Sequence, residues 1–177
     1  MKKAIIIGAS SGIGNELAKV FVQNGYKVGI TGRRKSKLEE LQQNNPEKYV
    51  ISSFDCTLEN NAKKLNVLAE KMGGLDLLIL SAGTGYLNKN LEYEIEHKTN
   101  LLNVNAFTEI TDWAFNFFLN QKKGHLVAIS SIAGIRGGRT APAYNASKAN
   151  QLFRRIKTKG KQLKKENLCN RYKTRIY

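Results

Sequence analysis

The first 24 residues carry the pattern that most restricts how this chain can fold. Residues 3–7 form a short, β-branched apolar run, which is typical of a parallel strand buried on both faces. The run ends in a turn that contains Gly8, Gly12 and Gly14, and apolar residues then recur at helical spacing over 13–24. A strand, a glycine-rich turn and a helix are therefore predicted in that order. Such a turn lets the backbone approach a pyrophosphate at the start of a helix.

The same alternation continues along most of the chain. Further strands are predicted at 26–31, 49–54, 75–80 and 125–129, and further helices at 36–43, 58–72 and 99–120. Because parallel strands need crossover helices, this order predicts an α/β protein with a Rossmann-type, doubly wound parallel sheet and helices on both faces. No low-complexity linker divides the 177 residues, which suit one domain. We expect this domain to cover residues 1–153.

The positive charge is concentrated near the C-terminus. The formal net charge is +15, but residues 1–150 carry 19 lysines and arginines against 13 acidic residues, whereas residues 151–177 carry 10 against 1. We interpret 154–177 as a basic C-terminal segment, either disordered and solvated or abnormal in origin. A nucleic-acid-binding protein is the least favoured functional class, because neither interleaved aromatic residues nor a known module accompanies the charge.

No targeting segment, membrane span or metal site is predicted. Only residues 4–7 separate the opening Met-Lys-Lys from the glycine turn, and no later stretch reaches the ~18 apolar residues of a membrane helix. We therefore expect a soluble, cytoplasmic protein without a membrane partner. Cys56, Cys169, His97 and His125 lack the spacing of metal ligands, and two distant cysteines do not indicate a disulfide framework.

A second group of residues indicates hydride-transfer chemistry. Tyr144 and Lys148 are four residues apart, so on one helix the ammonium shares a face with the phenol and can stabilise its phenolate. Ser131 lies thirteen residues before Tyr144 and follows a predicted strand, at the sheet edge where ligands of such folds bind. The group combines a proton donor, a cation that acidifies it and a hydroxyl that can hold a carbonyl oxygen.

The glycine spacing, together with Tyr144-x-x-x-Lys148, resembles the short-chain dehydrogenase/reductase family in its classical branch. The resemblance extends to about Lys148. It implies that Ser131, and not Ser130, is the catalytic hydroxyl. It also implies that Tyr144 is the general acid in reduction and the general base in oxidation, while Lys148 binds the nicotinamide ribose.

The resemblance implies further site residues. Asn105 matches the helix asparagine that positions the lysine through water in the family, and Asn103 is the competing candidate. Asp55 is expected to contact adenine. Two positions depart from the family pattern: Ile7 replaces a frequent threonine, and Leu80-Ser81 replaces an asparagine pair. The predicted nucleotide-binding residues are Gly8, Ser10, Ser11, Gly12, Ile13, Gly14, Arg33, Asp55, Cys56, Ser81, Ala82, Gly83, Tyr144 and Lys148.

Two arginines at the end of the second predicted strand bear on which nucleotide binds. Arg33 and Arg34 stand where an acidic residue would bind a ribose diol and favour NAD(H). Planar guanidinium donors suit a 2′-phosphate better than a neutral diol, so NADP(H) is the preferred cofactor and NAD(H) the alternative. Arg33 is the expected phosphate ligand. The competing interpretation is that both arginines are the solvated start of a helix.

The family pattern stops after Lys148. The remaining residues contain no Pro-Gly turn, no clear sixth strand and no substrate-covering segment. Residues 168–177 can be encoded by codons that, read one base later, specify Ser-Val-Thr-Asp-Ile-Lys-Pro-Gly-Phe-Ile, which is what the family would place there. We therefore hypothesise that the chain is truncated or frame-shifted after about Phe153, so that the C-terminal strands of the sheet are missing.

These observations favour an oxidoreductase that acts on CH–OH donors. It would transfer a hydride between NADP(H) and a small-molecule carbonyl or secondary alcohol, with Tyr144 as general acid and base. The alternative is a truncated, catalytically weak or inactive nucleotide-binding remnant of the same family. Family members commonly associate through the long helices that carry Asn105 and Tyr144, so a homo-oligomer is expected.

Overall fold

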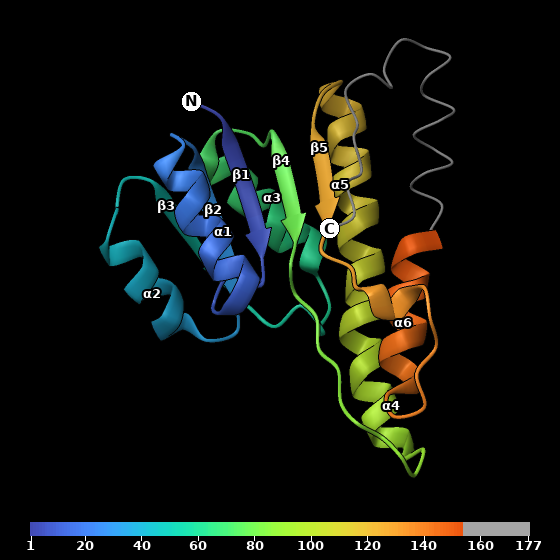
Figure 1. Cartoon of the computed structure of the whole chain (residues 1–177). Helices are drawn as coiled ribbons and strands as arrows, with labels where there is room; N and C mark the ends of the chain where they lie inside the picture. The colour runs from blue at the N-terminus through green and yellow to red at the C-terminus, as the bar shows by residue number, and fades with distance from the viewer. Residues whose placement is uncertain (154–177) are drawn as a thin grey trace.

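Parallel strands and the helices between them make up residues 1–153, the part of the chain that this computed structural model describes (Figure 1). The strands are β1 (Lys3–Ile7), β2 (Lys27–Gly32), β3 (Tyr49–Ser53), β4 (Leu77–Leu80) and β5 (His125–Ala128). The helices are α1 (Gly12–Gln23), α2 (Lys35–Gln43), α3 (Asn61–Met72), α4 (Tyr93–Asn100), α5 (Phe107–Gln121) and α6 (Pro142–Phe153), with a π-helical turn η1 (Leu101–Ala106) and a 3-10 turn η2 (Ile132–Gly134). The predicted basic segment 154–177, its hypothetical frame shift and the strands missing from it lie outside the described residues.

The strand order is β3-β2-β1-β4-β5, and every neighbouring pair is parallel. The chain runs outward from β1 through β2 to β3, then crosses back to place β4 on the other side of β1. In register, Ile7 of β1 lies opposite Thr31 of β2 and Leu80 of β4. The predicted doubly wound sheet is confirmed. The order in which the chain adds strands reverses between β1 and β4. Ligands of such sheets bind at the carboxyl ends of the strands beside this reversal.

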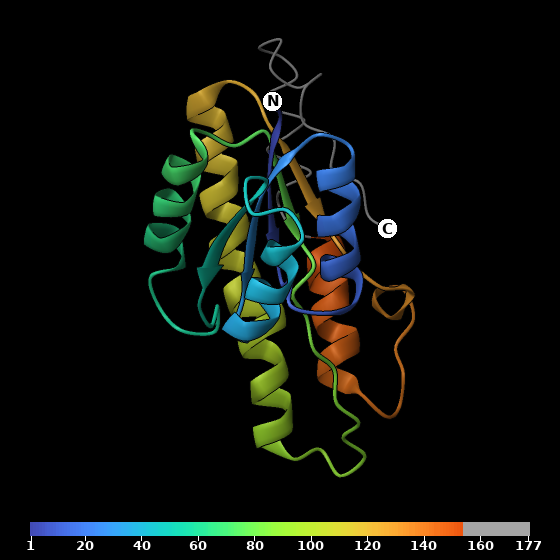
Figure 2. The same cartoon turned by 90° about the vertical axis from the view of Figure 1, so that its left-hand side faces the viewer.

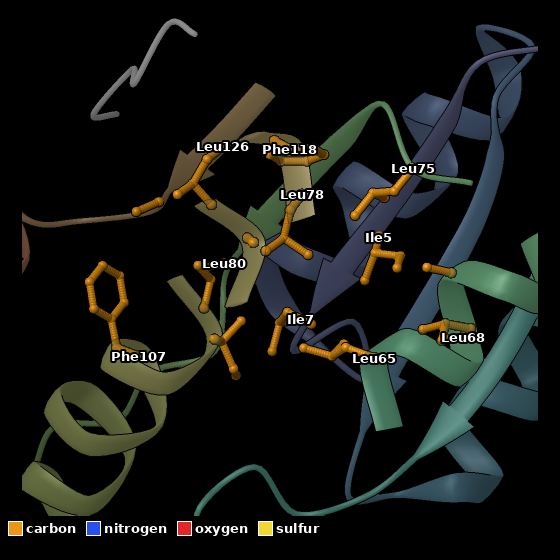
Figure 3. Close-up of a cluster of buried hydrophobic side chains, with 14 of the residues drawn as sticks. Ile5, Ile7, Leu65, Leu68, Leu75, Leu78, Leu80, Phe107, Phe118 and Leu126 are labelled. Atoms are coloured by element: carbon orange, nitrogen blue, oxygen red, sulfur yellow. The ribbon is translucent and has the colours of Figure 1, made fainter. Parts of the chain in front are cut away.

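Each strand contributes to two hydrophobic clusters, because alternate side chains point to opposite faces of the sheet. Ile5 and Ile7 pack in a cluster with α3 and α5, whereas Ala4 and Ile6 pack in a cluster with α1 and α2. Figure 2 shows α3 and α5 on one side of the sheet and α1 on the other. Figure 3 shows the α3 and α5 side, where Phe118 lies among residues from β4 and β5. Because helices cover both faces of the sheet, residues 3–7 of the central strand form an uninterrupted apolar run.

The predicted helix at 99–120 differs most from the structure. The helical segment begins at Tyr93 and consists of α4, η1 and α5 in succession. The π-helical turn inserts one extra residue and so changes which side chains face the neighbouring elements. The helix predicted from residue 58 begins instead at Asn61, because the Thr57 amide and hydroxyl both donate to Asp55 Oδ1, at 2.9 and 2.7 Å, in a turn that precedes the helix.

The last helix, α6, packs against α4, η1 and η2, so that it lies beside the carboxyl ends of the strands (Figure 1). This packing brings a helix from the end of the described chain to the same edge as the glycine turn from its beginning. Within residues 1–153, no helix has both the length and the apolar character needed to cross a membrane.

The core assignment can be tested with one substitution made at two places. Leu78 is 0% exposed in β4, and Leu78→Ala should lower the free energy of unfolding by about 2–5 kcal/mol because it leaves a cavity beneath α3 and α5. Leu58 is 63% exposed, and Leu58→Ala should change that free energy by about 0.5 kcal/mol or less. Urea denaturation followed by circular dichroism measures both, and equal losses would contradict the assignment.

Candidate functional site

Two adjoining cavities open at the carboxyl edge of the sheet. The first, of about 320 Å³, lies among the glycine turn and the ends of β1, β2 and β3. The second, of about 460 Å³, lies among the loop after β4, the end of β5 and α6. The predicted nucleotide-binding residues in the first cavity are Gly8, Ser10, Ser11, Gly12, Ile13, Arg33, Asp55, Cys56, Ser81, Ala82 and Gly83. Tyr144 and Lys148 line the second cavity, and Ile13, Ser81 and Gly83 line both.

The glycine turn holds three parts of the backbone close together. Gly8 has a φ of +89°, and a Cβ added there would lie 2.7 Å from the backbone of Ala82. Gly14 lies within α1, where a Cβ would collide with the carbonyl oxygen of Gly8. Gly14 therefore supports the turn without lining either cavity. Helix α1 begins at Gly12, beside the first cavity, and the free N–H groups of a helix N-terminus favour an anionic ligand.

Two guanidinium groups line the first cavity and differ in what holds them. Arg34 Nη2 donates to Ser11 Oγ at 2.6 Å and to Ser10 Oγ at 3.1 Å. Arg33 Nη1 lies 3.7 Å from Asp55 Oδ2, and its side chain is 71% exposed. The structure thus brings Arg34, and not the expected Arg33, onto the glycine turn. Both remain available to an anion because each lines the cavity.

Asp55 and Cys56 line the first cavity just beyond β3. Partial burial acts to raise the pKa of Asp55, but the hydrogen bonds from Thr57 and the nearby Arg33 guanidinium outweigh it and hold that pKa below its ordinary value. Asp55 is therefore a carboxylate at neutral pH. Burial, aided by the Asp55 charge, raises the pKa of Cys56 to about 11. The Cys56 thiol therefore stays protonated at neutral pH and is not a nucleophile.

Tyr144 and Lys148 share one face of α6, as their spacing predicts. Lys148 Nζ lies 5.7 Å from the centre of the Tyr144 ring. The lysine is only 5% exposed, and its ammonium donates to the Ile129 carbonyl oxygen and to Gln151 Oε1, each at 3.1 Å. Burial lowers the pKa of Lys148, whereas the two acceptors favour its charged form. This lysine is the only cationic side chain among the described residues of the second cavity.

The two serines after β5 are arranged differently from the prediction. Ser130 lines the second cavity, and its buried Oγ has no hydrogen-bond partner among residues 1–153. Ser131 Oγ instead accepts a hydrogen bond from the Ala133 amide at 3.1 Å and caps η2. Ser131 does not line the cavity. Ser130 is thus a lining residue of the cavity whose Oγ is itself buried, whereas the family pattern favours the hydroxyl of Ser131.

Asn103, from η1, lies in a buried hydrogen-bond network beside α6. Its Nδ2 donates to the Thr84 carbonyl oxygen at 2.6 Å and to Ser147 Oγ at 3.0 Å, and its Oδ1 accepts from the Thr84 amide at 2.9 Å. Its carbonyl oxygen accepts from Gln151 Nε2 at 3.0 Å. Asn105 is exposed and lines neither cavity. Residues two positions apart in a helical turn point to nearly opposite sides, so only one of the two asparagines can contact α6. That one is Asn103, which itself lines neither cavity.

Comparison with known proteins identifies a family and relatives that match most of the chain. Residues 2–163 match the family model described as short chain dehydrogenase. The chain is 31% identical over 153 residues to an uncharacterized oxidoreductase of Staphylococcus epidermidis. This alignment covers 84% of the chain and 66% of the relative, so the chain spans just under two thirds of the relative's length.

Solved structures have the same fold. A short chain dehydrogenase from Bacillus anthracis superposes with a TM-score of 0.84 at 24% identity, over 93% of this chain and 68% of that one. The structure of ElxO with NADP bound superposes with a TM-score of 0.78 at 25% identity, over 85% of this chain and 64% of that one.

The neutral state of Cys56 can be tested by its reactivity. A pKa of about 11 in place of 9.0 lowers the thiolate fraction at pH 8 about hundredfold. In a Cys169→Ser variant, Cys56 should therefore react with Ellman's reagent about a hundredfold more slowly than free cysteine. Its rate should rise about tenfold per pH unit up to pH 10, because thiolate is the reacting form. A rate equal to that of free cysteine at pH 8 would show that the thiol is neither buried nor neutral.

Proposed function

The chain belongs to the short-chain dehydrogenase family, and from this premise we propose that it transfers a hydride between NADP(H) and a carbonyl or secondary alcohol. Membership of the family is shown by the comparisons; the activity, the cofactor, the substrate class and the residue roles are our proposal. One observation carries it. The cavity lined by the glycine turn and two arginines adjoins the cavity lined by Tyr144 and Lys148, and Ile13, Ser81 and Gly83 line both. A nucleotide in the first cavity can therefore extend its nicotinamide into the second.

The first cavity fits a dinucleotide by its donor groups. The start of α1 at Gly12 would hold the pyrophosphate, because helix N-termini favour anions. Asp55, a carboxylate at neutral pH, can accept hydrogen bonds from an adenine amino group. Ser10 and Ser11 hold a guanidinium at the same end of the cavity. A bound nicotinamide would supply or accept the hydride.

The guanidinium groups support NADP(H) over NAD(H). Two serine hydroxyls of the glycine turn hold Arg34 in the lining of the first cavity, and its planar donor group suits a 2′-phosphate. The only carboxylate among the described lining residues of the first cavity, that of Asp55, already faces Arg33. The structural relative ElxO has NADP bound, which agrees with this preference. NAD(H) remains the alternative cofactor.

The second cavity supplies the groups that handle the proton. Tyr144 is proposed as the general acid in reduction, with its phenolate stabilised by the buried Lys148 ammonium 5.7 Å from the ring centre. A serine hydroxyl would hold the substrate oxygen while negative charge develops on it. Ser131 is the family candidate, and Ser130 is the alternative because it lines the second cavity, although its buried Oγ would have to turn toward the substrate. We propose Asn103, in place of Asn105, as the helix asparagine.

A second candidate function is a nucleotide-binding remnant of the same family without turnover. The first cavity, which would hold the nucleotide, contains neither Tyr144 nor Lys148, so binding there does not require the proton chemistry of the second cavity. Both candidates bind the nucleotide, but only the oxidoreductase turns over a substrate.

Replacement of the proposed acid separates these candidates. With aldehydes and ketones as probes, the wild-type chain should oxidise NADPH, followed at 340 nm. Tyr144→Phe should lower kcat by about 10²–10⁴-fold because the proton donor is lost. The dissociation constant of NADPH, from fluorescence titration, should change less than about twofold, since the ring is retained. Binding without turnover in the wild type would support the remnant, and binding of neither NADPH nor NADH would contradict both.

The arginine assignment predicts a change in nucleotide preference. Arg34→Ala should weaken NADPH binding by about tenfold to a hundredfold, as expected for a lost charge-assisted bond, and NADH binding by less than about threefold. Lys35→Ala is the matched control, because Lys35 is the next cation, pairs with Glu39 at 3.3 Å and does not line the cavity. A larger loss in Arg33→Ala than in Arg34→Ala would reassign the phosphate to Arg33.

A further inference from the structure

Gln151 is a buried polar side chain that the proposed chemistry leaves without a role. It lies on α6, one turn beyond Lys148, and is 8% exposed. Its Oε1 accepts from Lys148 Nζ at 3.1 Å, and its Nε2 donates to the Asn103 carbonyl oxygen at 3.0 Å. One neutral amide thus connects the buried ammonium to η1.

The position of the Lys148 ammonium depends on this amide. An ammonium has three N–H donors, and two are used by the Ile129 carbonyl oxygen and by Gln151 Oε1. Two fixed acceptors determine the direction of the third donor, since the three are arranged tetrahedrally. A flexible lysine stem would otherwise let the ammonium sample several positions. Gly83, which lines both cavities, lies close enough that a Cβ there would be 3.4 Å from Nζ.

We propose that Gln151 is a positioning residue that keeps Lys148 charged and directs its free N–H bond toward the junction of the two cavities. Its contribution to catalysis rests on the proposed function, since it acts through Lys148 on Tyr144. The amide is suited to this role because it accepts a hydrogen bond without adding charge. A carboxylate there would pair with the ammonium and weaken its effect on the phenolate, whereas an apolar side chain would remove one acceptor.

The other titratable groups near Lys148 do not substitute for Gln151. Tyr144 and Tyr86 share the cavity with the lysine. The turns η1 and η2, which pack against α6, carry no titratable residue. Helix α4, which also packs against α6, carries Tyr93, Glu94, Glu96, His97 and Lys98. Among the described residues, Lys148 donates to none of these side chains.

The test is the pKa of Lys148 in the full chain, from NMR of ¹³C-labelled lysine side chains, with Lys148→Met to assign the signal. Gln151→Met should lower this pKa by about one, because a charge-assisted acceptor is lost. Gln151→Glu should raise it, to above the ~10.4 of an exposed lysine, because an opposite charge replaces the amide. Gln121→Met is the matched control: its Nε2 donates to the Leu75 carbonyl oxygen at 2.7 Å, away from both cavities, and Lys148 should be unchanged.

The opposite directions of the two expected pKa shifts distinguish a positioning role of Gln151 from a loss of packing around α6. Loosening of α6 would admit water and raise the Lys148 pKa in both Gln151 variants, though not above that of an exposed lysine. Shifts in the same direction, or no shift in either variant, would overturn the proposal. If Gln151→Met does not fold, the Lys148 pKa in Gln151→Glu is the deciding measurement. A value above the ~10.4 of an exposed lysine supports the proposal, and a value at or below it overturns the proposal.

The readout does not require turnover, so the two proposals can fail separately. Opposite shifts in an inactive chain would support the positioning role and reject the oxidoreductase proposal. In an active chain, Gln151→Met should lower kcat about tenfold and leave the KM for the carbonyl substrate within about threefold. Unchanged kcat and unchanged Lys148 pKa would reject the inference and leave the proposed function intact.

Discussion

The close approach of α1 to the ends of β1 and β4 is the constraint on which the rest of the site depends. Any side chain at Gly14 would collide with the Gly8 carbonyl oxygen, and any side chain at Gly8 would meet the backbone of Ala82. These contacts set the first helix directly against the reversal point of the sheet. The loop after β4 is thereby placed between the two cavities, where Ser81 and Gly83 line both. The proposed nucleotide site and the proposed proton-transfer groups share one edge of the sheet because the backbone is packed this tightly.

Hydrogen bonds attach α6 to that edge, and residues 142–152 of this helix belong to neither hydrophobic cluster of the sheet. Asn103 connects the loop after β4 to α6 through Thr84 and Ser147, and Gln151 returns from α6 to the Asn103 carbonyl oxygen. Buried polar groups are costly unless they are paired, and this network pairs every one of these side chains. Such a network specifies one geometry where apolar contacts would tolerate several. The arrangement therefore gives the Tyr144 helix a single register against the sheet.

The sequence predicts the strands well, because strands covered on both faces must be apolar throughout, as residues 3–7 are. It also contains the signal that separates the two asparagines: Asn103 shares helical spacing with the buried Phe107, Ile110 and Ala114, and Asn105 does not. Sequence spacing does not decide between Arg33 and Arg34, or between Ser130 and Ser131. These choices depend on the direction of single side chains where a strand ends, and residue spacing does not encode that direction.

The two cavities use positive charge in opposite ways. In the first, Arg33 is 71% exposed, so an anion can be bound with little loss of hydration by the protein. In the second, Lys148 is 5% exposed, and its charge acts over a short distance through a medium that screens it weakly. Burial alone would drive this lysine toward its neutral form, which could not stabilise a phenolate. Its acceptors, a carbonyl and an amide, keep it charged without cancelling the charge. The neutrality of these two acceptors is therefore as important to the proposed chemistry as the lysine itself.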